Sequence, residues 1–334
     1  MQLNTLPSRA RKCYNGRFTM DPTDVGAIRR ARMEELMEKM RRFAVLPIAL
    51  VVLAACQGGT GSSPSAADGG AAAACDGETD GHLARICEAG VLKVSTDPAY
   101  PPQSILNEAT GEFEGFDIDV ATEIAERLGV EVQFETPTFD AVVAGDWSGR
   151  WDLSVGSVTI TEARKEVLDF TQPYYFTPAQ MAVHADSDIT DLDGLAGATI
   201  CVAEATTYLD WLEGSLTLPP EAGEVADPPE GATATTLPTD IDCAESWRSG
   251  RTDFEGWLSS ITTVEGAIRE DYPVVAVGDP VFFEPLAVAF DLAVEDNDSL
   301  VAAVDQILTD MHGDGTLAGF SETWFDGQDL TTDE

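Results

Sequence analysis

Hydrophobic and polar positions alternate between strand-like and helix-like patterns from about residue 90 onward. The apolar run VLKVST (91–96) predicts a buried strand, and the three prolines that follow predict a loop. GFDIDVATEIAERLG (115–129) has apolar residues at the i, i+3, i+4 positions of a helix, which should end at Gly129. The pattern continues with a strand (130–135), a short helix (139–147) and a strand (152–158). This order predicts a parallel α/β sheet with right-handed crossovers.

A second α/β pattern begins near Ala182. It predicts helices at 190–197, 205–214, 241–250 and 261–270, and strands at 198–204, 252–258 and 273–279. A loop rich in Pro and Gly (218–231) interrupts it. An amphipathic helix (299–315) and the segment TLAGFSETWF (316–325) follow. Two α/β lobes would place a cleft between them, where ligands commonly bind.

The N-terminal region has the pattern of an export signal. MRRFAVLPIALVVLAAC (40–56) has an arginine pair, an apolar run that is short for a membrane span, and small residues before Cys56. Leu53-Ala54-Ala55-Cys56 resembles the bacterial lipobox, which implies cleavage before Cys56 and lipid on its sulfur. The alternative is an uncleaved membrane anchor. Residues 1–39 are a doubtful extension, since Met33, Met37 or Met40 could be the start, and residues 57–74 predict a flexible tether.

Four cysteines remain if Cys56 is lipidated and Cys13 precedes the mature chain. An even number in an exported protein predicts two disulfides, and sequence order favours Cys75 with Cys87 and Cys201 with Cys243. Four cysteines nevertheless allow three pairings. None has C-x-x-C spacing, so no metal site is expected.

Charge excludes nucleic acid as a partner. The chain before Ile86 contains 11 of the 19 Lys and Arg residues and 9 of the 59 Asp and Glu residues. The rest of the chain therefore has 8 basic and 50 acidic residues. Nucleic acid binding needs a basic surface. An acidic surface stays soluble at high ionic strength, which agrees with a salt-rich habitat but identifies no function.

Catalytic motifs are absent, and the three histidines are widely spaced. The segment VGSVTITEARKEVLDF (155–170) stands out, because a strand end and a helix start bring Ser157, Thr159 and Arg164 together. Hydroxyls, helix-start N–H groups and a planar guanidinium suit a carboxylate. The alternative is that Arg164 pairs with a nearby acid such as Asp169.

Several segments together resemble family 3 of the bacterial extracellular solute-binding proteins, the polar amino-acid receptors of ABC importers. They are TDPAYPP (96–102), GEFEGFDIDVATEIAERLG, the stretch from Phe139 to Tyr175, DLDGLAGATICVAEATTYLDW and DQILTDMHGDGTLAGFSETWF, in consistent order over residues 86–327. The resemblance implies an α/β type II periplasmic-binding-protein fold, with a ligand cleft between two lobes and two interlobe crossings. Residues 75–180 plus 287–330 would form lobe 1, and residues 181–286 lobe 2.

The resemblance also implies a set of ligand-binding residues. Arg164 would clamp the ligand α-carboxylate, with Thr159 and Ser157 nearby. Tyr100 and Phe139 would flank the ligand, the alternative being ordinary core aromatics. The turn Ala205-Thr206-Thr207 would close on the carboxylate, and Asp97 would contact the side chain or amino group.

One position departs from the family pattern. Members commonly place an aspartate a few residues after the strand start G-R-x-D to hold the α-ammonium, whereas this chain has Trp257, Leu258 and Ser259. A buried ammonium needs an anionic partner. Asp97, Glu204 or Glu255 could supply it, Trp257 could cover a cation by its ring face, or the ligand lacks an ordinary α-amino group.

These observations predict a monomeric, lipid-anchored receptor outside the cytoplasm, at the outer face of the cytoplasmic membrane or in the periplasm. It would capture a small polar amino acid or related carboxylate and deliver it to an ABC permease and its ATPase. No catalytic residue, metal or cofactor is expected. The alternatives are a cyclohexadienyl or arogenate dehydratase-like enzyme on the same fold and a ligand sensor that does not transport.

Overall fold

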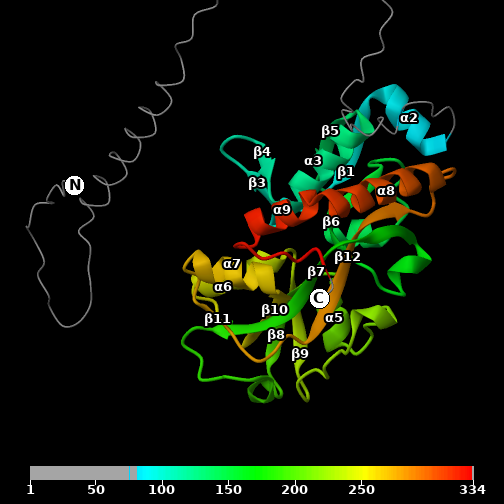
Figure 1. The fold of residues 1–334 in the computed structure, drawn as a ribbon. Helices are drawn as coiled ribbons and strands as arrows, with labels where there is room; N and C mark the ends of the chain where they lie inside the picture. Colours follow the sequence, from blue (N-terminus) through cyan, green and yellow to red (C-terminus); the bar gives the residue numbers. More distant parts are fainter. Residues whose placement is uncertain (1–74, 76–80, 333–334) are drawn as a thin grey trace, which may run out of the picture. The chain divides into compact units, whose positions relative to one another are not determined.

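Two long antiparallel strands, β7 (Leu168–His184) and β12 (Phe282–Asp291), lie side by side through the middle of the molecule (Figure 1). The computed structural model describes Cys75 and residues 81–332, which fall in one compact unit. β7 and β12 belong to a nine-stranded sheet with the order β5-β1-β6-β12-β7-β10-β8-β9, in which β11 also pairs with β7. The remaining strands of this sheet are β1 (Val91–Ser95), β5 (Glu131–Glu135), β6 (Leu153–Thr159), β8 (Thr199–Ala203), β9 (Thr233–Leu237), β10 (Gly256–Ser260) and β11 (Val274–Ala276).

Lobe 1 is built on the parallel strands β5, β1 and β6 at one end of the sheet. Its helices are α2 (Gly81–Ala89), α3 (Phe116–Leu128), α4 (Phe139–Val143), α8 (Asp298–Asp314) and α9 (Thr316–Trp324). The apolar face predicted for α3 packs into the lobe 1 core, and the helix ends at Gly129 in a left-handed conformation, as expected. The same core takes Leu300, Val304 and Leu308 from α8. Residues close to both ends of the described chain therefore complete lobe 1.

Lobe 2 is built on the parallel strands β10, β8 and β9 at the other end of the sheet. Its helices are α5 (Thr207–Leu212), α6 (Asp240–Arg248) and α7 (Ile261–Arg269). Two hydrophobic clusters fill it, one around Trp211 and Phe282 and the other around Trp247 and Trp257. Each of the predicted helices at 205–214, 241–250 and 261–270 is confirmed, with slightly different ends.

The two lobes share β7 and β12, so the chain crosses between them twice. Tyr175 and Leu286 belong to the lobe 1 core, while Ala179 and Phe282 belong to the lobe 2 core. The change of lobe thus falls within a few residues on each crossing strand. The lobe boundaries expected from the sequence, between residues 180 and 181 and between residues 286 and 287, stay a prediction.

Several expected elements differ in the structure. The sheet is mixed, because β7 and β12 run antiparallel to their neighbours. The helix start expected in the segment 155–170 and the helix expected at 190–197 are short 3₁₀ turns, η1 (Arg164–Glu166) and η2 (Leu192–Leu195). A third 3₁₀ turn, η3 (Pro220–Ala222), lies in the expected loop, and the strands β9, β2 (Ala99–Tyr100), β3 (Ser104–Asn107) and β4 (Glu112–Glu114) were not predicted.

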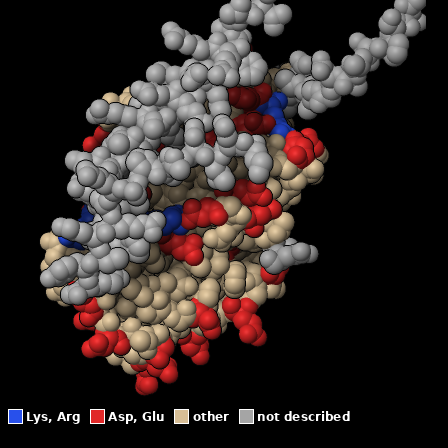
Figure 2. Space-filling view, turned by 60° about the vertical axis from the view of Figure 1, so that its left-hand side comes forward, with Lys and Arg blue, Asp and Glu red and all other residues tan. Residues whose placement is uncertain are grey.

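Both favoured cysteine pairs are confirmed. Cys75 is bonded to Cys87, and Cys201 to Cys243. The signal, the extension, the tether and Cys56 lie outside the described residues. None of the described helices is long and apolar enough to span a bilayer. Figure 2 shows many Asp and Glu side chains and few Lys and Arg on the visible part of one face, as the charge count suggests.

Candidate functional site

A small cavity lies where the lobes meet. It has a volume of about 30 Å³, room for roughly two water molecules. Residues from both lobes and from the crossing strand β12 line it. They are Asp97, Tyr100, Phe139, Gly156, Ser157, Thr159, Ala203, Thr206, Thr207, Tyr208, Pro238, Thr239, Asp240, Glu284 and Leu286. Seven residues predicted to bind ligand are therefore brought together here, namely Asp97, Tyr100, Phe139, Ser157, Thr159, Thr206 and Thr207.

Strand β6 carries Ser157 and Thr159 to the lobe 1 side of the cavity. The Ser157 hydroxyl donates to Asp117 (2.8 Å) and lies 2.7 Å from the Tyr175 hydroxyl. Tyr174 also donates to Asp117, and burial raises the pKa of this carboxyl to about 7 despite both hydrogen bonds. The Ser157 hydroxyl thus already belongs to a buried network behind the cavity.

Two residues other than glycine adopt left-handed backbone conformations at the cavity, one in each lobe. Ser157 has φ 53° and Ala205 has φ 60°. Such conformations cost free energy and cluster where the structure positions functional groups. Ala205 precedes Thr206, which caps α5 by accepting from Leu209 N–H and donates to the Ala203 carbonyl.

Arg164 lies next to the cavity, although it is not one of the residues that line it. Its Nη1 donates to the Thr159 carbonyl (2.9 Å) and its Nη2 to the Ala205 carbonyl of lobe 2 (3.1 Å). The guanidinium carbon stands 5.3 Å from the centre of the Phe139 ring, within the range of a cation–π contact. Arg164 therefore joins the two lobes through main-chain acceptors, and the alternative pairing with Asp169 is not what the structure has.

Glu284 is a cavity residue that the sequence analysis did not identify. It is 2% exposed and accepts hydrogen bonds from three hydroxyls: Thr159 (2.7 Å) and Thr207 at Oε1, and Tyr208 (2.8 Å) at Oε2. Burial raises its pKa, while the hydroxyls and nearby Arg164 act in the opposite direction. Its position as the one acid in the apolar run from Val281 to Phe290 could have indicated a buried functional carboxylate.

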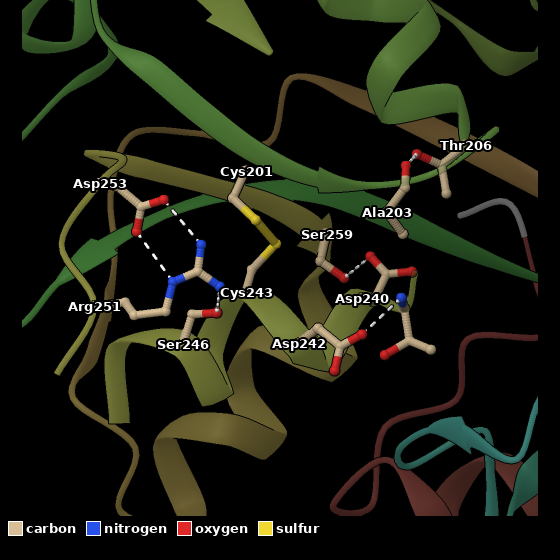
Figure 3. The surroundings of a disulfide bond; sticks show 11 residues. Cys201, Ala203, Thr206, Asp240, Asp242, Cys243, Ser246, Arg251, Asp253 and Ser259 are labelled. Atoms are coloured by element: carbon tan, nitrogen blue, oxygen red, sulfur yellow. Dashed lines mark hydrogen bonds and ion pairs between the residues drawn. A yellow bond between two sulfur atoms is a disulfide. The ribbon is translucent and has the colours of Figure 1, made fainter. Parts of the chain in front are cut away.

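Asp240 is the second missed carboxyl. It opens α6, points toward Ser259 and accepts a hydrogen bond from its hydroxyl (2.8 Å; Figure 3). Burial raises the pKa of Asp240 to about 7. Three residues further along α6, Cys243 is bonded to Cys201 of β8, so the disulfide fastens the helix carrying Asp240 to the strand that leads to Ala203 (Figure 3).

Asp97 is the cavity acid on the lobe 1 side. Its Oδ1 accepts from Ala99 N–H (2.7 Å), and burial raises its pKa. The other proposed substitutes for the missing aspartate lie elsewhere: Glu204 and Glu255 are exposed and do not line the cavity, and Glu255 accepts from Thr199 N–H.

Trp257 requires a correction. The sequence analysis suggested that its ring could cover a ligand cation, but the side chain is fully buried in the lobe 2 core beside the Cys201–Cys243 disulfide and does not line the cavity. The reason is its position along β10. Trp257 and Ser259 point to the same face of the strand, but Trp257 lies two residues further from the strand end that approaches Asp240. Trp257 packs deep in the core, whereas Ser259, at the strand end, reaches Asp240.

Further hydrogen bonds hold the lobes against each other beside the cavity. Gln103 of lobe 1 donates through Nε2 to Thr262 (2.7 Å) and Ser260 (3.3 Å), and the Thr263 hydroxyl donates to the Pro101 carbonyl (3.1 Å). Glu162 N–H donates to the Thr217 carbonyl (3.1 Å). The arrangement is that of two lobes closed on a buried polar cavity. Within the described residues, no group of three or more His, Cys, Asp or Glu is placed to hold a metal ion.

Comparison with known proteins agrees with this architecture. The family model for bacterial extracellular solute-binding proteins, family 3, matches residues 92–327. The chain is 28% identical to the L-cystine-binding protein TcyJ of Escherichia coli over 254 residues, which cover 75% of this chain and 88% of that protein. It is also 28% identical to the probable amino-acid-binding protein YxeM of Bacillus subtilis over 302 residues, covering 89% and 99% of the two chains.

A solved structure with the same architecture is the ancestral amino-acid-binding protein AncCDT-1, described as a precursor of cyclohexadienyl dehydratase. It has a TM-score of 0.62 and 28% identity, and the alignment covers 73% of this chain and 99% of that one. Two lobes, two crossings and a cavity between the lobes make the fold of this chain the type II periplasmic-binding-protein fold, as predicted.

Proposed function

The chain belongs to family 3 of the bacterial extracellular solute-binding proteins, and on that basis we propose that it is the substrate-binding component of an ABC importer. In this proposal it captures a small polar amino acid or a related solute between its lobes and delivers it to a membrane permease with its ATPase. The supporting observation is the cavity itself, which is lined from both lobes and carries three acids, several hydroxyls and aromatic rings.

Binding would act by shifting the population between open and closed forms. A solute in the cavity contacts lobe 1 through Asp97, Tyr100 and Thr159 and lobe 2 through Thr207 and Asp240 only when the lobes are closed. Its binding free energy therefore favours closure. The permease would distinguish the closed form from the open one, because closure fixes the position of one lobe relative to the other.

Arg164 is the proposed anchor for a negative group of the solute. Two of the five guanidinium N–H donors are directed to main-chain carbonyls, which leaves further donors and the positive charge. Phe139 covers the guanidinium and lines the cavity, so a small movement of this ring would open a path between Arg164 and the solute.

Anchoring and location complete the proposal. Lipid on Cys56 would hold the receptor at the outer face of the cytoplasmic membrane or in the periplasm, as a monomer on a flexible tether. Membrane fractionation of cells that express the chain and its Cys56→Ser variant tests the anchor. The variant should leave the membrane fraction, and a variant that stays there would show that another segment holds the protein.

The receptor function is tested by titration calorimetry and thermal shift with the twenty amino acids and related solutes. We expect one chemical group of solutes to bind and to raise the melting temperature, and Arg164→Ala, which also removes the hydrogen bond to Ala205 of the other lobe, to weaken this binding at least tenfold. Lys165→Ala is the matched control, because Lys165 is exposed and pairs with Glu162. Failure of every solute to bind would contradict the proposal.

A second candidate is a dehydratase-like enzyme, which the structure favours through Asp240. Dehydration needs an acid that protonates a leaving hydroxyl, and a cavity carboxyl with a pKa of about 7 is partly protonated at neutral pH. Turnover of prephenate or arogenate, abolished by Asp240→Asn, would establish this function. Binding without turnover would favour the receptor, or a sensor that presents the solute to a membrane partner.

A further inference from the structure

Glu284 is bound as a ligand carboxylate would be. Its two oxygens accept from hydroxyls of both lobes, Thr159 on β6 and Thr207 and Tyr208 on α5, while the residue itself stands on the crossing strand β12. Thr159 and Thr207 are the same hydroxyls that the family resemblance assigns to the carboxylate of an amino acid. The protein therefore supplies an internal carboxylate to these donors.

The charges around the cavity also indicate that it is not built to receive a carboxylate. Asp97, Asp240 and Glu284 line it, and among the described residues that do so none is Lys or Arg. The nearby cation, Arg164, is 6% exposed and already joins Thr159 to Ala205 through carbonyl oxygens. Buried carboxyls need a cationic partner or a proton, and here burial raises the pKa of all three.

The acids lie where a positive group could join the lobes. Asp97 belongs to lobe 1 and follows β1, whereas Asp240 belongs to lobe 2 and opens α6. A cation between them gains attraction to both only when the lobes are closed. A free carboxylate brought to Thr159 and Thr207 would instead meet Glu284, a group of its own sign on the same donors.

We propose that the site between the lobes takes an organic cation, an amine or a guanidinium compound, and that Glu284 provides internally the carboxylate on which the lobes close, so the solute needs none of its own. Because the cavity as it stands has room for only about two water molecules, the lobes would close less tightly around this solute. This proposal rests on the proposed receptor function and narrows its substrate class. Basic amino acids and the amines formed by removing their carboxyl groups would both bind.

Titration calorimetry of the purified full-length chain with matched solute pairs tests the proposal. The pairs are arginine with agmatine, lysine with cadaverine, and ornithine with putrescine, each differing by one carboxylate. We expect at least one pair to bind, with dissociation constants that differ by less than tenfold between its members. Glu284→Gln, which removes the internal charge, should shift the preference toward the carboxylate-bearing member by tenfold or more, and exposed Glu295→Gln should not.

The outcomes separate this inference from the receptor function. An amino acid that binds more than tenfold tighter than its amine partner in every pair that binds, or binding restricted to neutral and acidic amino acids, overturns the inference and leaves the receptor function in place. Failure of the whole solute library to bind wild-type protein overturns the receptor function itself. The comparison of pairs on wild-type protein decides the matter even if Glu284→Gln does not fold.

Discussion

Asp240→Asn is the substitution that tests the electrostatics of the closed cavity most directly. The Asp240 carboxyl is 9% exposed and accepts a hydrogen bond from Ser259. Asparagine has nearly the same shape, and its amide oxygen can still accept that hydrogen bond. The substitution therefore removes a titratable group from the cavity with little change in packing.

The expected effect follows from the pKa of Asp240. Folding raises this pKa from 3.8 to about 7, so the folded protein holds the proton more tightly, by a free energy of roughly 4 kcal/mol. Below pH 3.8 the carboxyl is protonated in both states, and its stabilising contribution is fully present. As pH rises toward 7, the unfolded chain ionises first and the folded protein loses stability.

The variant lacks this titration. Relative to wild type, Asp240→Asn should therefore gain little at pH 4 and progressively more up to pH 8, with about 4 kcal/mol as the upper limit. Parting of the lobes returns the wild-type carboxyl to water and reduces the gain. Asp117, whose pKa is also about 7, is present in both proteins and cancels in the difference.

The assay is urea unfolding of the solute-free protein at pH 4, 6 and 8, followed by circular dichroism. Asp188→Asn is the matched control, because Asp188 lies in the same lobe and is exposed. A difference in unfolding free energy between wild type and Asp240→Asn that is the same at pH 4 and pH 8 would refute the reasoning.

Three further predictions concern the frame around the cavity. Replacing Cys201 and Cys243 by alanine removes a cross-link between residues 42 apart and should lower the free energy of unfolding by about 4 kcal/mol, measured by urea unfolding; a loss below about 1 kcal/mol would contradict this. Gly115→Ala should lower the free energy of unfolding by at least about 2 kcal/mol in the same assay, because φ is +136° and the new Cβ would lie 2.2 Å from the Gln103 carbonyl oxygen. Gly313→Ala is the contrasting variant, because Gly313 lies inside α8 with open space around it. It should raise the free energy of unfolding by about 0.5–1 kcal/mol. Gln103→Ala removes the hydrogen bonds to Thr262 and Ser260 between the lobes, so solute affinity should fall about tenfold in calorimetry while the melting temperature of the solute-free protein stays within 2 °C or so; an equal loss in both would mean that Gln103 supports the fold rather than closure.

Local sequence patterns were sufficient for the elements with strong periodicity. The helix at Phe116–Leu128 and the strand at Val91–Ser95 appear as predicted, because apolar spacing and turn residues agree there with the tertiary packing. The crossing strand β7 was not recognised. It is 17 residues long and contains Pro173 and Pro178, which weaken a strand pattern although β7 pairs with its neighbours on both sides.

The candidate site was predictable in part from the residue pattern, which indicated Ser157, Thr159 and Arg164, and otherwise only where the family resemblance provides residue positions. Tyr100, Phe139, Thr159 and Thr207 line the cavity as that resemblance implies. Asp240 and Glu284 were missed because each has an ordinary structural explanation. An acid at the start of a helix usually serves to interact with the helix dipole, and an acid in a strand usually faces water. Only the packing of the lobes shows that these two carboxyls share one cavity with Asp97.

The two crossings also determine the order in which the lobes can fold as the chain emerges, N-terminus first. Lobe 2 is one continuous segment, so its cores are available once residues up to about Phe282 have emerged. Lobe 1 begins with α2 at Gly81 but cannot close its core until Leu300, Val304 and Leu308 of α8 arrive. The N-terminal lobe must therefore wait with exposed apolar surface for the end of the chain, which makes it the part most dependent on protection against aggregation.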